Sequence, residues 1–222
     1  MAFILNIETA TKNCSVSVAE NGKTIVLKEL NDGNYSHAEK LHEFIRHAVN
    51  EAGIDLKILS AIGVSQGPGS YTGLRIGISA AKGLCFALNI PLIAVSTLES
   101  LALSYSIIEG FKIPLLDARR MEVYSAVFNA KNESIRVVKA EIIASDSFQK
   151  YLADQKVYFF GDGAEKCKEI IVHDNAFFVP QKFPSANDMA SLSFDKYKKN
   201  DIEDVAYFEP FYLKDFIITK AK

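Results

Sequence analysis

A short strand, a glycine-rich turn and a helix of small residues follow one another in residues 61–77, which read AIGVSQGPGSYTGLRIG. Glycine tolerates positive φ angles and close approach of other groups, proline fixes one φ angle, and a hydroxyl group can cap the helix. The residues that can play these roles are Gly67, Pro68, Gly69, Ser70, Thr72 and Gly73. A junction of this kind serves phosphate binding, nucleophilic catalysis or close packing, and the spacing has to decide among them.

The spacing of this junction does not fit the known phosphate-binding loops. From Gly67 the pattern G-P-G-S-Y-T-G is one residue longer than the dinucleotide fingerprint G-x-G-x-x-G. Gly73 is followed by Leu74 and Arg75, where a P-loop needs Lys and then Ser or Thr. The next strand ends in Ser96, where the dinucleotide fold expects a ribose-binding acid. We therefore expect no nucleotide phosphate at this loop.

The same segment contains a literal match to the G-x-S-x-G pattern of serine hydrolases, centred on Ser65. An acid, Asp117 or Asp162, and then His173 follow in the order of an α/β-hydrolase triad. A nucleophile elbow requires the helix to begin just after the serine, because its N–H groups form the oxyanion hole. Here several loop residues intervene, so a serine hydrolase or peptidase using Ser65 is the alternative function.

Close packing accounts for the helix that follows the turn. Gly73, Gly77, Ala80 or Ala81, and Leu84 fall on one helix face with little side-chain bulk. Another backbone can approach such a face closely. The neighbour is either the protein's own sheet or a helix of a partner subunit.

Composition indicates a soluble globular protein with one large or two small domains, because 49% of the 222 residues are hydrophobic. The apolar runs are far short of the roughly 20 residues that span a bilayer, and the start has no basic region typical of a signal peptide. We expect a cytoplasmic protein. A net charge of −2 gives no general attraction to nucleic acid, and three widely spaced cysteines suggest neither a zinc site nor disulfides.

The two halves of the chain begin in the same way. The stretches Phe3 to Glu8 and Cys14 to Ala19 have the alternating pattern of a hairpin, and Ile113 to Asp117 and Met121 to Phe128 repeat this layout. The two acids that end the first strand of each pair are 117 − 8 = 109 residues apart, close to half the chain. The sequence therefore predicts two related α/β halves, residues 1–108 and 109–222.

A duplicated unit of strand, hairpin and helices resembles the actin, sugar kinase and heat-shock ATPase superfamily, in which nucleotide lies between the halves. The hairpin loops of that superfamily normally carry an acid followed by glycine, and neither loop of this chain has the glycine. A further turn, Gly161-Asp162-Gly163-Ala164, is either a relic of an adenosine contact or a plain turn before a helix. The candidate nucleotide-binding residues are therefore Glu8, Thr9, Asp117, Gly161 and Gly163.

Three histidines lie on the first predicted helix, which a capping box beginning at Ser36 starts and Gly53 ends. His37, His42 and His47 recur every five residues, so successive imidazoles are rotated by about 140° at 3.6 residues per turn. They cannot share a metal ion, because two imidazoles on one face need the spacing i, i+4. We expect no metal site.

With these motifs the chain resembles the bacterial TsaB (YeaZ) family over nearly its whole length. The matching segments are ILNIETAT, GPGSYTGLRIGISAAKG, IAVSTLESLA, DARRMEVYSAVF, GDGA, PSANDMASL and PFYLK. The resemblance implies the superfamily fold with a degenerate second half. It also implies a non-catalytic scaffold subunit of the complex that installs threonylcarbamoyladenosine at position 37 of tRNA.

The resemblance further implies partners for this chain. These are the catalytic homologue TsaD and the ATPase TsaE, with ATP used by the complex, tRNA contacted through the complex, and pairing with a second copy when the chain is alone. The family's interface is built by its first two helices, here with Leu41 and Ile45 and with Gly67, Pro68, Gly69, Ser70, Thr72, Gly73, Arg75, Gly77 and Ala80. On this basis Gly77→Leu is expected to weaken the TsaD complex and leave the monomer folded.

Overall fold

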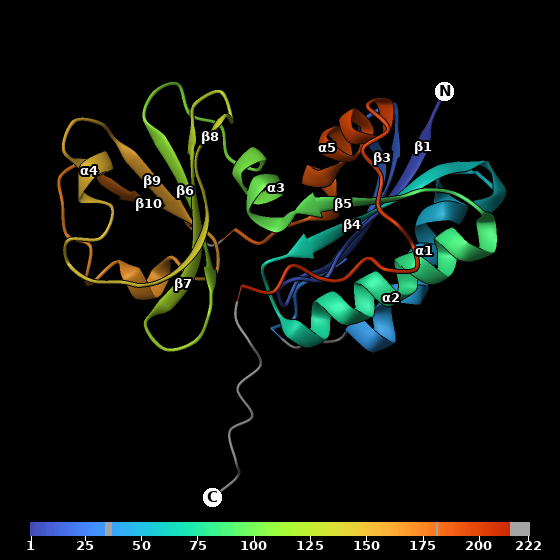
Figure 1. Cartoon of the computed structure of the whole chain (residues 1–222), viewed down its shortest axis with the longest axis horizontal. Coiled ribbons are helices and arrows are strands. Elements are labelled where there is room, and N and C mark those ends of the chain that lie inside the picture. The colour runs from blue at the N-terminus through green and yellow to red at the C-terminus, as the bar shows by residue number, and fades with distance from the viewer. Residues whose placement is uncertain (34–36, 181, 214–222) are drawn as a thin grey trace, which may run out of the picture.

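The computed structural model describes residues 1–33, 37–180 and 182–213. They form two lobes, each built on its own five-stranded sheet (Figure 1). The strands of the first sheet are β1 (Phe3–Glu8), β2 (Cys14–Glu20), β3 (Lys23–Leu30), β4 (Leu59–Gly67) and β5 (Leu92–Ser96). Those of the second sheet are β6 (Phe111–Asp117), β7 (Glu122–Asn129), β8 (Ser134–Ile142), β9 (Val157–Phe160) and β10 (Ala176–Phe178).

The two sheets have the same topology. The strand order is β3-β2-β1-β4-β5 in the first and β8-β7-β6-β9-β10 in the second. β1 pairs antiparallel with β2 and parallel with β4, and β6 pairs in the same way with β7 and β9. Glu8 and Asp117 therefore end equivalent strands, and the predicted two-lobed α/β fold is confirmed.

Helices cover both faces of the first sheet. α1 (His37–Glu51) and α2 (Tyr71–Leu88) pack on one face, and α5 (Ala186–Lys198) packs on the other. Alternate residues of β1 point to the two faces, with Leu5 facing α1 and α2 and Ile4 facing α5. The predicted cap Ser36 lies outside the described residues.

The second lobe has only single-turn helices where the first lobe has α1 and α2. They are α4 (Gln149–Leu152) and the 3₁₀ helix η2 (Glu165–Cys167), and the first lobe has a similar 3₁₀ turn, η1 (Leu56–Ile58). The core of the second lobe relies on aromatic side chains, for example Phe148 and Phe159 with ring centroids 5.4 Å apart. The shortened helices make this the degenerate half.

Helix α3 (Thr97–Leu103) connects the lobes and is shorter than predicted, since the sequence pattern favoured a helix to Ile108. The buried Lys112 of β6 lies at its C-terminal end. Its Nζ atom donates hydrogen bonds to the carbonyl oxygens of Ala102 at 2.8 Å and Tyr105 at 3.1 Å. These interactions satisfy carbonyl groups at the helix end, and burial lowers the pKa of Lys112 to about 8.

The chain returns to the first lobe after the second sheet. α5 is followed by a C-terminal strap, residues 201–213, whose Glu203 amide donates to the Leu92 carbonyl at 2.9 Å. The predicted division between residues 108 and 109 falls between α3 and β6 and stays a prediction. Within the part of the chain that the structure describes, no helix has the length and hydropathy needed to cross a bilayer.

Candidate functional site

The turn between β4 and α2 packs directly on the loop between β1 and β2. Ser70 caps α2, since its hydroxyl oxygen accepts a hydrogen bond from the Gly73 amide at 3.2 Å, and its own amide donates to the Ala10 carbonyl at 2.7 Å. A Cβ atom on Gly69 would lie 2.5 Å from the same carbonyl oxygen, and Gly67 has a φ angle of +112°. The prediction of a glycine turn packed against backbone is confirmed.

Gly73 and Gly77 face the protein's own Thr9. A Cβ atom on Gly73 would lie 2.1 Å from the Thr9 carbonyl oxygen, and one on Gly77 would lie 2.3 Å from Thr9 Oγ1. Leu41 and Ile45 are buried in the core of the first lobe. These four residues pack within the protein's own fold, and their place in the predicted interface stays a prediction. The small face of α2 meets the protein's own backbone.

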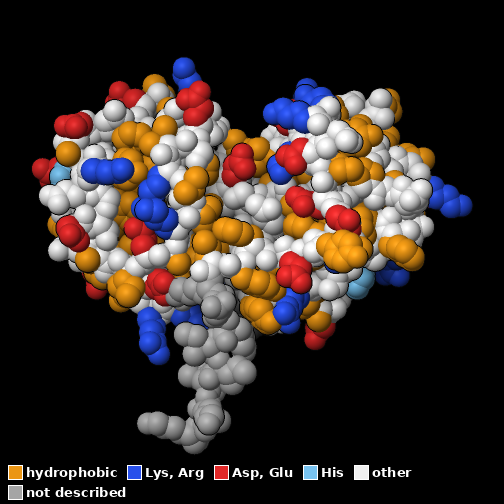
Figure 2. All heavy atoms as spheres, viewed as in Figure 1, with side chains coloured by type: hydrophobic (Ala, Val, Ile, Leu, Met, Phe, Trp, Pro, Cys, Tyr) orange, Lys and Arg blue, Asp and Glu red, His pale blue; other side chains and the backbone are white. Residues whose placement is uncertain are grey.

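An open groove of about 780 Å³ lies on the outer side of α2. Its lining residues are Ala38 and His42 of α1 and Tyr71, Thr72, Arg75, Ile76, Ser79, Ala80, Gly83 and Leu84 of α2. Thr72, Arg75 and Ala80 of the predicted interface are among them. Figure 2 shows hydrophobic side chains gathered over the lower part of the right lobe, where α2 lies.

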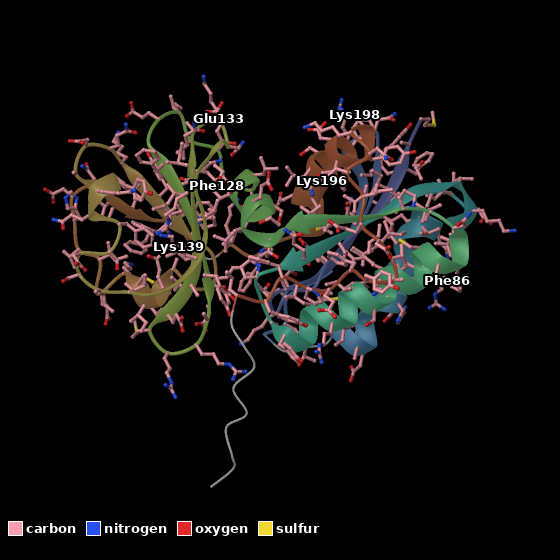
Figure 3. All side chains as sticks on the ribbon, viewed as in Figure 1. Phe86, Phe128, Glu133, Lys139, Lys196 and Lys198 are labelled. Carbon is pink, nitrogen blue, oxygen red and sulfur yellow. The ribbon has the colours of Figure 1, made fainter. Side chains whose placement is uncertain are left out.

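Sequence reasoning missed one residue of the groove and one exposed residue outside its lining on the same helix. Gly83 lies on the groove, and a Cβ atom there would have no other atom within 4 Å. Phe86, labelled in Figure 3 near the end of α2, is 85% exposed. Its position opposite the apolar stripe of the helix was the available signal. A large exposed apolar side chain beside small residues is typical of a protein-binding surface.

Ser65 and Glu8 lie side by side at the ends of β4 and β1 and are buried, with exposed fractions of 1% and 0%. Ser65 Oγ accepts a hydrogen bond from the Thr9 amide at 3.4 Å, and Glu8 Oε1 accepts one from the Ala10 amide at 2.6 Å. Burial raises the pKa of Glu8 to about 7, although these amides and the Ser65 hydroxyl group favour its charged form.

The histidines are used elsewhere in the fold. His37 Nε2 contacts the Thr11 carbonyl oxygen at 2.7 Å, and His173 Nδ1 accepts a hydrogen bond from the Asn175 amide at 3.1 Å in the second lobe.

A nucleophilic serine must reach its substrate, and the buried Ser65 does not. Among the described residues, no three His, Cys, Asp or Glu side chains are grouped to hold a metal ion.

The candidate nucleotide-binding residues of the second lobe have structural partners of their own. A Cβ atom on Gly161, which has a φ angle of +106°, would lie 2.2 Å from a backbone oxygen of β6, and one on Gly163 would lie 2.9 Å from its backbone. Asp117 pairs with Lys166 and accepts a hydrogen bond from the Arg119 amide at 2.9 Å. This packing supports the interpretation of the GDGA segment as a turn, although a 3₁₀ turn rather than an α-helix follows it.

Helix α5 covers the face of the first sheet that carries Glu8 and Ser65. The Ala186 amide donates to Ser15 Oγ, and Ser17 Oγ donates to the Ala186 carbonyl, both at 2.8 Å. Polar side chains of the central strands thus bind the protein's own backbone. Fold and site together define a two-lobed α/β protein of the actin, sugar kinase and heat-shock ATPase class with an open groove on α2.

Comparisons with known proteins place the chain within this class. It matches the family model described as TsaD, tRNA N6-adenosine threonylcarbamoyltransferase, over residues 32–221. The tRNA threonylcarbamoyladenosine biosynthesis protein TsaB of Bacillus subtilis is 29% identical over 219 residues, 95% of this chain and 93% of that protein. TsaB of Escherichia coli is 28% identical, over 98% of this chain and 96% of its own length. The chain belongs to the TsaB (YeaZ) family.

A solved structure agrees with this assignment. YeaZ from Pseudomonas aeruginosa superposes with a TM-score of 0.82 at 26% identity. The match covers 96% of this chain and 100% of the YeaZ chain. The agreement extends over both lobes, because nearly the whole chain is covered.

Proposed function

We propose that this chain is a non-catalytic subunit of the cytoplasmic machinery that makes threonylcarbamoyladenosine in tRNA, and that it binds and stabilises the catalytic subunit TsaD through the groove on α2. The biosynthesis names of the full-length TsaB relatives support the pathway. In this proposal the ATPase TsaE joins the complex, the complex uses ATP, and tRNA is contacted through the partner.

The groove supports helix docking through its shape. The side chains of Thr72 and Ser79 are small and Gly83 has none, so the outer side of α2 carries little bulk and a partner helix can approach closely. Phe86 supplies an exposed aromatic side chain of the kind that anchors interfaces. Because TsaD is a homologue, the same surface can also pair with a second copy of this chain.

The absence of catalysis is supported by the burial of the strongest catalytic candidate. Ser65 is 1% exposed, and Glu8 beside it is fully enclosed. A hydrolase would have to open the first lobe to admit substrate. The groove, in contrast, is open.

Gly83→Leu is expected to weaken TsaD binding about 10- to 100-fold, because overfilling a packed contact costs about 1–3 kcal/mol. Space around Gly83 is open in the free protein, so the thermal unfolding temperature should not fall. Isothermal titration calorimetry with purified TsaD measures the affinity. Ser191→Leu, at an exposed position on α5, is the matched control. Unchanged affinity of the Gly83 variant would refute docking through the groove.

Ser65→Ala is expected to leave tRNA modification within about twofold of the wild-type rate, since the buried Ser65 does not reach a substrate. Stability should fall by about 1–3 kcal/mol, because the buried Thr9 amide loses its acceptor. The assay is threonylcarbamoyladenosine formation by the reconstituted proteins. A large loss of activity with the complex still assembled would favour the serine hydrolase instead.

A further inference from the structure

Arg75 is held at one end of the groove by two tyrosines from distant parts of the chain. Its guanidinium carbon lies 4.0 Å from the centroid of the Tyr71 ring, and its Nε donates a hydrogen bond to the Tyr212 hydroxyl group at 3.1 Å. The centroids of the Tyr71 and Tyr212 rings are 5.1 Å apart. Tyr71 and Arg75 both line the groove, and Tyr212 contacts them from the strap.

The C-terminal strap positions Tyr212. The Phe211 amide donates to the Gln66 carbonyl at 2.8 Å, and a Cβ atom on Gly67 would lie 2.9 Å from the Phe211 carbonyl oxygen. Lys82 of α2 donates to two backbone oxygens earlier in the strap, both at 3.1 Å. These hydrogen bonds hold the strap along the side of α2. Tyr212, near the end of the strap, accepts the hydrogen bond from Arg75.

Arg75 keeps its charge available to solvent. The side chain is exposed, and within residues 1–33, 37–180 and 182–213 it forms no ion pair with an acid. Its Nε donates to Tyr212, and Tyr71 also hydrogen-bonds the guanidinium group, whose remaining N–H groups stay available as donors in a planar fork. A planar fork of donors matches the two oxygens of a carboxylate.

We propose that Arg75 binds a carboxylate side chain of the partner that occupies the groove, and that Tyr71 and Tyr212 hold the guanidinium group in its binding orientation beforehand. This inference rests on the proposed function, because the partner helix in the groove carries the carboxylate. The partner is thereby expected to have an Asp or Glu at the edge of its apolar helix face.

Both parts of the proposal follow from the composition of the cluster. Arginine and tyrosine are the residues most often found at energetic hot spots of interfaces, and a side chain ordered in advance loses less entropy on binding. A nucleic acid backbone would instead require several free cations, and Lys82 on the same helix is already used by the strap. A protein carboxylate therefore suits this site better than phosphate.

The test is the affinity of full-length variants for TsaD at low and high salt. Arg75→Glu is expected to weaken binding about 100-fold or more at low salt, and Arg75→Lys about 10-fold, because lysine lacks the planar fork. Tyr212→Phe removes only the acceptor for Nε and should weaken binding about threefold to tenfold with unchanged thermal unfolding. Arg46→Glu, at an exposed position of α1 outside the groove lining, should change affinity less than twofold.

Each other outcome overturns a stated part of the proposal. If Gly83→Leu weakens binding and Arg75→Glu does not, the carboxylate contact is refuted and the groove remains the docking site. If neither variant weakens binding, the proposed function fails as well. If Arg75→Glu weakens binding while Arg75→Lys and Tyr212→Phe have no effect, orientation by the tyrosines is refuted.

Discussion

Gly77→Leu is expected to lower the free energy of unfolding by about 3 kcal/mol or more, because a Cβ atom at this position would lie 2.3 Å from Thr9 Oγ1. Thr9 cannot move away freely, since its hydroxyl group donates a hydrogen bond to the Gly73 carbonyl at 2.8 Å. The structure thus overturns the expectation that the monomer tolerates leucine here. Urea denaturation followed by circular dichroism measures the change.

The matched control for this prediction is Gly83→Leu, which changes the same residue type in the same way on the same helix. Its Cβ atom has open space, so stability should stay the same or rise by up to about 1 kcal/mol, the usual cost of glycine in a helix. Equal loss of stability in the two variants would contradict the packing of Gly77 on Thr9. Together they separate the inner side of α2 from its outer side.

Glu8→Gln is expected to stabilise the protein by roughly 3 kcal/mol above pH 7, because Glu8 is fully buried and its pKa is raised from 4.5 to about 7. A carboxyl group that holds its proton more tightly in the folded protein contributes most to the free energy of unfolding below pH 4.5. Between pH 4.5 and pH 7 the unfolded chain loses this proton first, so the stability of the wild type falls as pH rises. Above pH 7 Glu8 is ionised in both states, and the free-energy cost of burying its charge no longer changes with pH.

The measurement is the free energy of unfolding of wild type and Glu8→Gln at several pH values from 4 to 8. The difference between the two curves isolates Glu8 from other acids with raised pKa values, such as Asp188. The difference should grow from pH 4.5 to pH 7 and then level off. Parallel curves would show that Glu8 is ionised in the folded protein without cost.

Features set by neighbouring residues could be predicted from the sequence. The strands ending in Glu8 and Asp117 were found because their alternating pattern is local, and they occupy equivalent places in the two sheets. Helix α2 was predicted from Ser70 to Leu88, and the structure has Tyr71–Leu88 with Ser70 as the cap. Caps and periodicity are properties of adjacent residues, so no tertiary information was needed.

Features set by distant residues could not be predicted. Helix α3 ends at Leu103, and Lys112 from the next strand binds the carbonyl groups of Ala102 and Tyr105 on either side of this end. The periodicity of α2 located a small face but not its neighbour, so Gly77 was placed in the interface and Gly83 was missed. The contact of Tyr212 with Arg75 joins residues 137 positions apart, beyond any local pattern.

The most direct test of the proposed subunit role is size-exclusion chromatography with light scattering on this protein mixed with TsaD of the same organism. We expect a stable heteromeric peak, and this mixture with TsaE, ATP and a donor of the threonylcarbamoyl group should restore threonylcarbamoyladenosine formation on tRNA. With the Gly83→Leu variant instead, the heteromeric peak should shrink and the separate peaks should grow. If the wild-type protein forms no complex with TsaD under any nucleotide condition, the proposed subunit role is contradicted.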